Sequence, residues 1–233
     1  MNGAILNICL NFAQDLFPQS CYLCGALAGR QPVCVDCRTD LIRHNQPACP
    51  ICAYPTVQGE ICGQCLRHPP AYQRTVAGYR YAFPTDKLIH GLKYHHQFAL
   101  VDTLTAPLLD KITTRPDALI AMPLHPQRLS ERGYNQSQLL ATVISRQLAV
   151  PRLSQATTRT RNTAPQAGLP LHERHANIKN AFTADAQQVA GKHIAIVDDV
   201  MTSGSTLNSL ARSLHQAGAS EVSCWVVARA VLK

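Results

Sequence analysis

The sequence predicts an α/β fold in which a doubly wound parallel sheet follows a small N-terminal module. Across residues 71–233, short apolar segments alternate with amphipathic helical segments, which is the pattern of parallel strands joined by helices. Across residues 1–70, cysteines recur in closely spaced pairs, and so short a segment buries little apolar surface of its own. We therefore expect an N-terminal module of residues 1–70 and an α/β domain of residues 71–233.

The cysteines indicate metal sites. Eight of the ten form four Cys-x-x-Cys pairs, and the spacing from Cys21 to Cys37 is repeated from Cys49 to Cys65, as in a duplicated unit. Two such pairs close a tetrahedral four-sulfur shell around zinc, so we expect about two structural Zn²⁺ ions per chain. We prefer pairing within each unit, and cross-braced pairing is the alternative. The expected ligands are Cys21, Cys24, Cys34, Cys37, Cys49, Cys52, Cys62 and Cys65.

Other residues near these pairs have simpler roles. Cys9 and Cys224 stand alone and are expected to be small buried hydrophobes. His44 and His68 are expected on the surface, because four cysteines already complete each shell. A redox role for the pairs is the weaker alternative, since no thioredoxin-like strand and helix surround them.

The charge of the chain is uneven. The net charge is +8, yet residues 1–70 carry four basic and four acidic residues, whereas residues 122–182 carry eight basic and two acidic ones. This bias favours a phosphate-bearing ligand, either a small metabolite or nucleic acid, over a merely solvated basic face. The sequence contains no apolar run of the roughly 18 residues that span a membrane, and no signal peptide is recognisable. We therefore expect a cytoplasmic protein that does not bind membranes.

Four segments of the α/β domain have the composition of strands. The first alternates apolar and polar residues up to Pro84, and the others are short apolar runs typical of strands buried on both faces. Pro123 ends the second of them. The four span residues 76–83, 118–124, 193–200 and 221–231.

Four further segments show helical periodicity. Thr85 is the expected N-cap of the first, Pro107 is expected to kink or break the second, and Gly218 follows the end of the fourth. Residues 154–178 show little periodicity, so we expect a long functional loop there. The helical segments span residues 85–98, 99–112, 135–150 and 205–219. The apolar face of the third comprises Leu139, Leu140, Val143, Ile144 and Leu148.

The segment IAIVDDVMTSGSTL, residues 194–207, carries the strongest functional signal. A hydroxyl-rich turn that enters a helix presents free N–H groups at the positive end of the helix dipole, which is a phosphate-binding arrangement. Gly204 permits close approach of the backbone. Asp198 and Asp199 precede this turn and can accept hydrogen bonds from sugar hydroxyls or hold Mg²⁺. A ribose 5-phosphate meets both requirements; an ordinary strand, turn and helix with a capping aspartate is the alternative.

This segment resembles the phosphoribosyl pyrophosphate (PRPP) signature of type I phosphoribosyltransferases. Together with residues 122–137, residues 159–182 and the duplicated cysteine module, it makes nearly the whole chain similar to the ComF/GntX family. The resemblance implies a type I phosphoribosyltransferase-like sheet with a double zinc-ribbon module, and PRPP bound with Mg²⁺. It also implies a role in the use of external DNA as a nutrient or in competence.

The resemblance assigns roles to individual residues. Arg128 and Arg132 would face the departing diphosphate, and the two aspartates would face the ribose and Mg²⁺. The basic and amide side chains outside residues 198–206 can each brace a loop instead of contacting the ligand. The implied catalytic residues are Asp198, Asp199, Arg128 and Arg132. The implied PRPP contacts are Asp198, Asp199, Thr202, Ser203, Gly204, Ser205, Thr206, Lys93, Gln166 and Arg174.

Two functions remain open. The first is a Mg²⁺-dependent phosphoribosyltransferase of unknown acceptor. Thr202 stands where purine-salvage enzymes have an aspartate base, which disfavours a purine acceptor. The sequence begins Met-Asn rather than with the nucleophilic cysteine of an amidotransferase, so we do not expect it to release ammonia from glutamine by that route. The second is a non-catalytic protein that keeps the PRPP site as a sensor or as a cleft for single-stranded DNA. The absence of aromatic residues between Tyr134 and Phe182 argues against base stacking along this segment. Because the zinc module is near-neutral, we expect it to bind a protein partner or to pack on the α/β domain rather than to bind nucleic acid.

Overall fold

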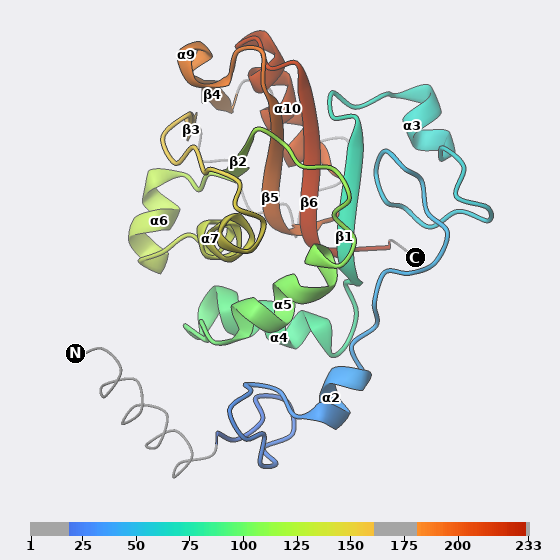
Figure 1. Cartoon of the computed structure of the whole chain (residues 1–233), viewed down its shortest axis with the longest axis vertical. Helices are drawn as coiled ribbons and strands as arrows, with labels where there is room; N and C mark the ends of the chain where they lie inside the picture. The colour runs from blue at the N-terminus through green and yellow to red at the C-terminus, as the bar shows by residue number, and fades with distance from the viewer. Residues whose placement is uncertain (1–18, 161–180, 232–233) are drawn as a thin grey trace.

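The computed structural model describes residues 19–160 and 181–231, and its centre is a four-stranded parallel sheet (Figure 1). The strands lie in the order β1-β6-β5-β2, and all three pairings are parallel. Each strand expected in the α/β domain is present, so the predicted fold class is confirmed. The strands are β1 (Arg74–Arg80), β2 (Ala118–Ala121), β5 (His193–Met201) and β6 (Glu221–Arg229).

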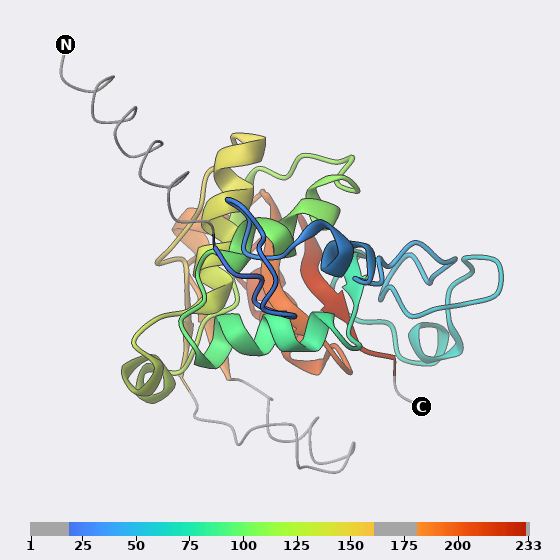
Figure 2. The same cartoon turned by 90° about the horizontal axis from the view of Figure 1, so that it is seen from below.

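Helices cover both faces of this sheet (Figures 1 and 2). On one face, Ile194 and Ile196 of β5 pack in a core with Leu207 and Leu210 of α10 (Ser205–Gln216). On the other face, the alternate β5 residues join a second core with α4, α5 and α7. Alternation follows from the strand geometry, in which successive side chains point to opposite faces. These three helices are α4 (Thr85–Tyr94), α5 (Leu100–Leu109) and α7 (Gln136–Leu148).

Shorter elements complete the described chain. Two strands form an antiparallel pair that packs near α10, and part of the expected long loop therefore has regular structure. The pair is β3 (Thr157–Arg159) and β4 (Phe182–Ala184). The short helices are α2 (Val35–Thr39), α3 (Gly63–Arg67), α6 (Pro126–Arg132) and α9 (Ala186–Val189). No helix of the described ranges combines the length and apolar character needed to cross a membrane.

Two helix details add to the expectation or differ from it. Of the kink or break expected at Pro107, the break does not occur, because Pro107 lies inside α5. A proline has no N–H for the carbonyl four residues earlier, and here the hydroxyl of Tyr79 donates to that carbonyl, on Thr103, at 2.9 Å. Thr85 is the first residue of α4 rather than its N-cap, which is Pro84, and the buried hydroxyl of Thr85 has no hydrogen-bond partner among the described residues.

The two cysteine units lie at different places on the α/β domain (Figure 1). Tyr22 of the first unit packs so closely on α4 that a Cβ added at Gly91 would lie 2.6 Å from its hydroxyl oxygen. In the second unit, Thr75 of β1 donates from its N–H to the Pro50 carbonyl at 3.3 Å and from its hydroxyl to the Ile51 carbonyl at 2.6 Å. Both units are therefore docked on the domain rather than freely tethered.

The surface position expected for His44 is wrong. His44 is 5% exposed, and neither ring nitrogen has a hydrogen-bond partner among the described residues. Burial, with help from the nearby charge of Lys111, lowers the pKa of His44 to about 4, so its ring is neutral at pH 7. His68 is exposed as expected, and Cys224 is fully buried in β6. Cys9 lies outside the described residues.

Candidate functional site

Each cysteine unit brings its own four sulfur atoms together. Within each unit, all four Sγ atoms lie within 4.8 Å of one another. The Sγ–Sγ distance is 3.7 Å between Cys24 and Cys34 and 3.6 Å between Cys52 and Cys62. Tetrahedral zinc with Zn–S bonds of about 2.3 Å places its sulfurs about 3.8 Å apart, so both shells fit zinc. Pairing within each unit is confirmed, and four sulfurs leave no open position for catalysis.

One thiol of each shell is already biased towards the thiolate that binds metal. Burial raises the pKa of Cys21, but backbone N–H donors outweigh it and lower that pKa to about 6. The N–H of Cys34 is one of these donors, 3.4 Å from the Cys21 sulfur. Cys49 repeats the arrangement in the second unit, with a pKa of about 7. The duplication therefore preserves the electrostatics as well as the spacing.

The turn between β5 and α10 has free backbone donors. Gly204 is the N-cap of α10 with φ +76°, a conformation that favours glycine. A Cβ there would also lie 2.7 Å from the hydroxyl oxygen of Tyr72, so a side chain cannot fit without movement. Among the described residues, nothing accepts a hydrogen bond from the N–H of Ser203 or Gly204. These donors sit at the positive end of a helix, where an anion binds favourably.

Asp198 and Asp199 lie within β5, which continues past them to Met201. Asp198 is partly buried, and its Oδ1 accepts from the Ser137 hydroxyl at 2.9 Å and from the Asp199 N–H at 2.9 Å. Burial, and then the charge of Asp199, raise the pKa of Asp198 to about 7. Asp198 therefore holds a proton easily in the free protein, and a cation or a hydroxyl donor would favour its charged form.

Asp199 has a built-in counterion. Its side chain is enclosed, and the Lys93 ammonium lies 2.8 Å from Oδ2. That oxygen accepts no hydrogen bond from the described residues, so the contact is an ion pair without hydrogen-bond alignment. Burial by itself would lower the pKa of Lys93, but the charge of Asp199 reverses this and the net shift is upward. Lys93 is thus placed at the acids, as a charged partner of Asp199.

The predicted arginines have different surroundings. Arg132 donates to the side-chain oxygen of Gln136, and its guanidinium lies 5.2 Å from the centroid of the Tyr94 ring. Arg132 is therefore held by the protein itself. Arg128 belongs to α6, and its charge acts on Arg159: burial lowers the pKa of Arg159, Arg128 lowers it further, and Asp198 opposes both. Arg159 thus lies within electrostatic range of both Arg128 and Asp198. Gln166 and Arg174 lie outside the described residues.

Two further polar residues, Ser137 and Asn135, hold this site together. The Ser137 hydroxyl binds Asp198 directly, and Asn135 caps α7 by accepting from the Ser137 N–H at 2.9 Å. The amide nitrogen of Asn135 also donates to the Met122 carbonyl at 3.0 Å, which ties α7 to the end of β2. A polar residue in the first turn of a helix that follows a strand is the available signal for Ser137. It is weak, because serine is common at such positions for local reasons.

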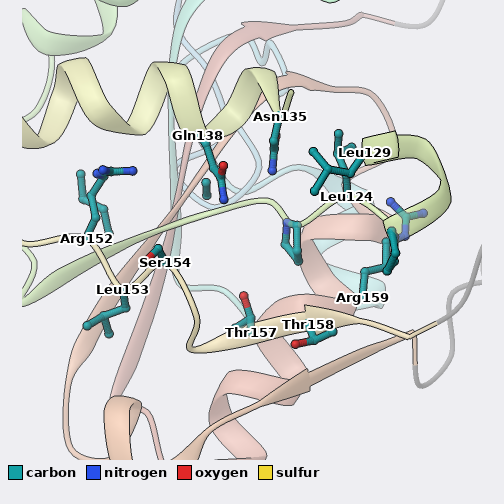
Figure 3. A pocket seen from close by; sticks show the side chains of 14 residues that line it. Leu124, Leu129, Asn135, Gln138, Arg152, Leu153, Ser154, Thr157, Thr158 and Arg159 are labelled. Carbon is teal, nitrogen blue, oxygen red and sulfur yellow. The ribbon is translucent and has the colours of Figure 1, made fainter. Parts of the chain in front are cut away.

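A small pocket lies on the β2 side of the site, with a volume of about 160 Å³ (Figure 3). Asn135 and Gln138 project towards it from α7, and Thr157, Thr158 and Arg159 border it along β3. Leu124 and Leu129 supply apolar lining. The pocket does not include the two aspartates or the turn of residues 202–206, so it adjoins the candidate site without forming its centre.

A larger pocket of about 1140 Å³ opens at the turn itself. Residues 202–205 form one side, and the second cysteine unit and the linker after it form the other. No carboxylate lines this pocket, whereas Arg67, His68 and Arg212 do. The turn therefore faces open, basic space rather than packed protein. Arg229 lies in the same lining but is 5% exposed.

Comparison with known proteins agrees with both parts of this structure. Residues 12–66 match the double zinc ribbon domain, and residues 135–231 match the phosphoribosyl transferase domain. DNA utilization protein YhgH of Escherichia coli K12 is 38% identical, over 91% of this chain and 97% of the relative. Competence protein F of Haemophilus influenzae is 36% identical, over 72% and 78%. The chain belongs to the ComF/GntX family.

This member of the ComF/GntX family therefore joins two four-cysteine zinc-ribbon sites to a phosphoribosyltransferase-like domain. A solved glutamine PRPP amidotransferase from B. subtilis overlaps 56% of this chain and 26% of its own, with 19% identity and a TM-score of 0.40. So distant a likeness carries no functional argument. The relatives' names connect the family with DNA utilization and competence.

Proposed function

We propose that this protein binds PRPP, or a closely related ribose 5-phosphate, at the junction of β5 and α10. The observation that carries the proposal is the juxtaposition of two carboxylates with a turn that has two available N–H groups. Asp198 and Asp199 stand within β5, and the N–H groups of Ser203 and Gly204, which have no partner among the described residues, follow a few residues later. Carboxylates suit a sugar diol or Mg²⁺, and helix N-terminal amides suit a phosphate.

Each side chain has a distinct part in this proposal. The turn of residues 202–206 holds the 5-phosphate through its amides and hydroxyls. Asp198 accepts from the ribose hydroxyls, with Ser137 fixing the carboxylate orientation at 2.9 Å. Lys93 neutralises the charge of Asp199 in the ligand-free protein. Bound Mg²⁺ would neutralise the diphosphate, and Asp198 and Asp199 are the oxygen ligands that fit it.

The reaction that such a site supports is transfer of the phosphoribosyl group. A nucleophilic acceptor forms a bond to the anomeric carbon while the bond from that carbon to the diphosphate oxygen breaks. The electron pair leaves with pyrophosphate, and the acceptor loses its proton to solvent. The protein contributes orientation and charge stabilisation, and none of its side chains is required as a nucleophile. The names of the relatives support a role for this site in DNA utilization or competence.

Calorimetric titration with PRPP and Mg²⁺ tests the proposal. We expect saturable binding by the wild type and at least about a tenfold loss in the Asp198→Asn/Asp199→Asn double variant, since each lost charge-assisted hydrogen bond is worth roughly 1.5–3 kcal/mol. Asp102→Asn, on the exposed surface of α5, is the matched control and should bind like the wild type. Absence of PRPP binding by the wild type would refute the proposal. Pyrophosphate release, screened over nucleobases and amines, then measures catalysis separately.

A second candidate function is binding of single-stranded DNA without catalysis. The observation that favours it is the basic pocket of about 1140 Å³ beside the turn, which has no carboxylate in its lining. The structure also gathers aromatic rings from distant segments: Phe98 lies 4.9 Å from Tyr134, centroid to centroid. Salt-sensitive binding of an oligodeoxynucleotide that survives in the double variant, without PRPP binding by the wild type, would favour this function.

A further inference from the structure

Arg229, the last residue of β6, connects the second zinc shell with the phosphate-binding turn. Its Nε donates to the carbonyl of Cys52, a residue of the second shell, at 2.8 Å. Its Nη1 donates to the carbonyls of Met201 at 3.1 Å and Thr202 at 2.6 Å, which lie where the turn begins. It also donates to the carbonyl of Ala230. One planar guanidinium therefore fixes backbone on both sides.

The Cys52 end of this link belongs to a rigidly docked turn. The carbonyls of Pro50, Ile51 and Cys52 follow one another between the first two sulfurs of the second shell. Thr75 binds the first two of these carbonyls, and Arg229 binds the third. A metal that fixes the sulfurs of Cys49 and Cys52 also fixes the direction of these carbonyls, because only two residues separate the ligands.

A pocket separates part of the second shell from the turn, and beneath it Cys52 and Cys65 share a buried core with Met201. The pocket of about 1140 Å³ is lined by Cys52, Cys62 and Cys65 on one side and by residues 202–205 on the other. Apolar packing at the edge of this pocket is not directional, whereas the hydrogen bonds of Arg229 fix particular carbonyls on both sides. Tyr72 also lies against Gly204 at this edge.

The charge of Arg229 also connects it with the second zinc shell. Its side chain is 5% exposed, yet no carboxylate among the described residues pairs with it; the Tyr54 ring lies 5.4 Å away. A buried cation is costly unless an opposite charge compensates it. Four thiolates around Zn²⁺ carry a net charge of −2, and Arg229 binds the backbone of one of them. The zinc-loaded second shell, through the net negative charge of its thiolates, therefore compensates Arg229 where no described carboxylate does.

We propose that Arg229 is a positioning residue that makes the order of the phosphate-binding turn depend on zinc in the second shell. Within the described ranges no hydrogen bond joins the first shell to this turn, and its contact with the domain is the packing of Tyr22 on α4. Loss of the second zinc would loosen the Cys52 carbonyl and then the carbonyls of Met201 and Thr202. Its consequence for ligand affinity rests on the proposed PRPP site, but the link itself does not.

Hydrogen exchange of the full-length, zinc-loaded protein tests the link without any ligand. Cys62→Ser removes one ligand of the second shell and leaves Arg229 and its acceptors unchanged. Cys34→Ser removes the equivalent ligand of the first shell and is the matched control. We expect peptides covering residues 201–206 to exchange about fivefold faster or more in Cys62→Ser and in Arg229→Lys, and at the wild-type rate in Cys34→Ser. Lysine keeps the charge but cannot bridge the same carbonyls.

Two outcomes would overturn the proposal. The first is unchanged exchange of residues 201–206 in Cys62→Ser, with metal analysis confirming the loss of one zinc. The second is equal acceleration in Cys34→Ser, which would indicate general destabilisation. Peptides from the centre of β6 must exchange at the wild-type rate for the folded state to be compared. Where Cys62→Ser fails this check, Arg229→Lys decides, because it leaves both shells intact.

A reciprocal measurement separates this proposal from the PRPP site. Because the coupling of binding free energies is mutual, PRPP with Mg²⁺ should raise the affinity for one of the two zinc ions about fivefold in competition with a chelator, and the effect should vanish in Arg229→Lys. If calorimetry detects PRPP binding and both zinc affinities keep their unliganded values, the coupling is refuted and the site stands. If PRPP does not bind, the proposed function fails and the exchange experiment alone decides the link.

Discussion

Replacing Asp198 by asparagine should stabilise the free protein, and increasingly so as the pH rises. The carboxyl of Asp198 has its pKa raised from 3.8 to about 7, first by burial and then by Asp199. Asparagine can keep both hydrogen bonds that Oδ1 accepts, from the Ser137 hydroxyl and the Asp199 N–H, while it removes the charge. The variant therefore isolates the cost of a charged group in this position.

The magnitude follows from the pKa. Each pKa unit is worth about 1.4 kcal/mol, so a shift of about three units sets a ceiling of about 4 kcal/mol. Lys93 and Asp199 also interact with the Asp198 charge, and replacing Asp198 changes those interactions too. We therefore expect the Asp198→Asn variant to be more stable than the wild type by about 1–3 kcal/mol at pH 8. A raised acid pKa means that the folded state holds the proton longer, so the penalty is absent below pH 4, grows up to pH 7 and is then constant. Between pH 6 and pH 8 the advantage of asparagine should grow by about 1 kcal/mol.

Urea unfolding of the zinc-loaded protein without Mg²⁺ measures this advantage. Trp225 is the single tryptophan, lies 2% exposed in β6, and reports unfolding by fluorescence. Asp102→Asn, on exposed α5 surface, should show no growth between pH 6 and pH 8. An Asp198→Asn variant that is less stable than the wild type at pH 8, or whose advantage is the same at both pH values, would contradict the reasoning.

Three other predictions concern the turn, the metal and the core. Gly204→Ala should weaken PRPP binding, measured by calorimetry, at least about tenfold and destabilise the protein by about 1–3 kcal/mol. The reason is that φ at Gly204 is +76° and Tyr72 blocks the new Cβ. The control is Gly133→Ala, where φ is +79° but the space is open, and PRPP binding should be unchanged. Metal analysis should find about two zinc ions in the wild type and one in Cys62→Ser; two in the variant would refute the ligand assignment. Leu104→Ala should cost about 2–5 kcal/mol in urea unfolding, because Leu104 is 0% exposed, against less than about 0.5 kcal/mol for Leu66→Ala at 65% exposure.

Local patterns determined much of the fold. The duplicated Cys-x-x-Cys spacing specified two shells, because two intervening residues fix how a pair of sulfurs can face one ion. Alternation specified the first strand of the parallel sheet and apolar runs the other three, and the Asp-Asp and Thr-Ser-Gly-Ser-Thr segments lie in β5 and at the start of α10. These features depend on residues that are neighbours in the chain, so the sequence displays them directly.

Only the tertiary structure decided which distant residues meet. The counterion of Asp199 comes from α4, the hydroxyl that holds Asp198 comes from α7, and the second zinc shell reaches the turn through Arg229 at the end of β6. The burial of His44, which was expected at the surface, likewise depends on residues far from it in the chain. A single lysine, serine or arginine has no distinguishing local pattern, and its role follows from the packing of helices and strands far apart in the chain. The sequence by itself therefore determined the elements and the chemistry they offer, and the fold determined which charges compensate one another.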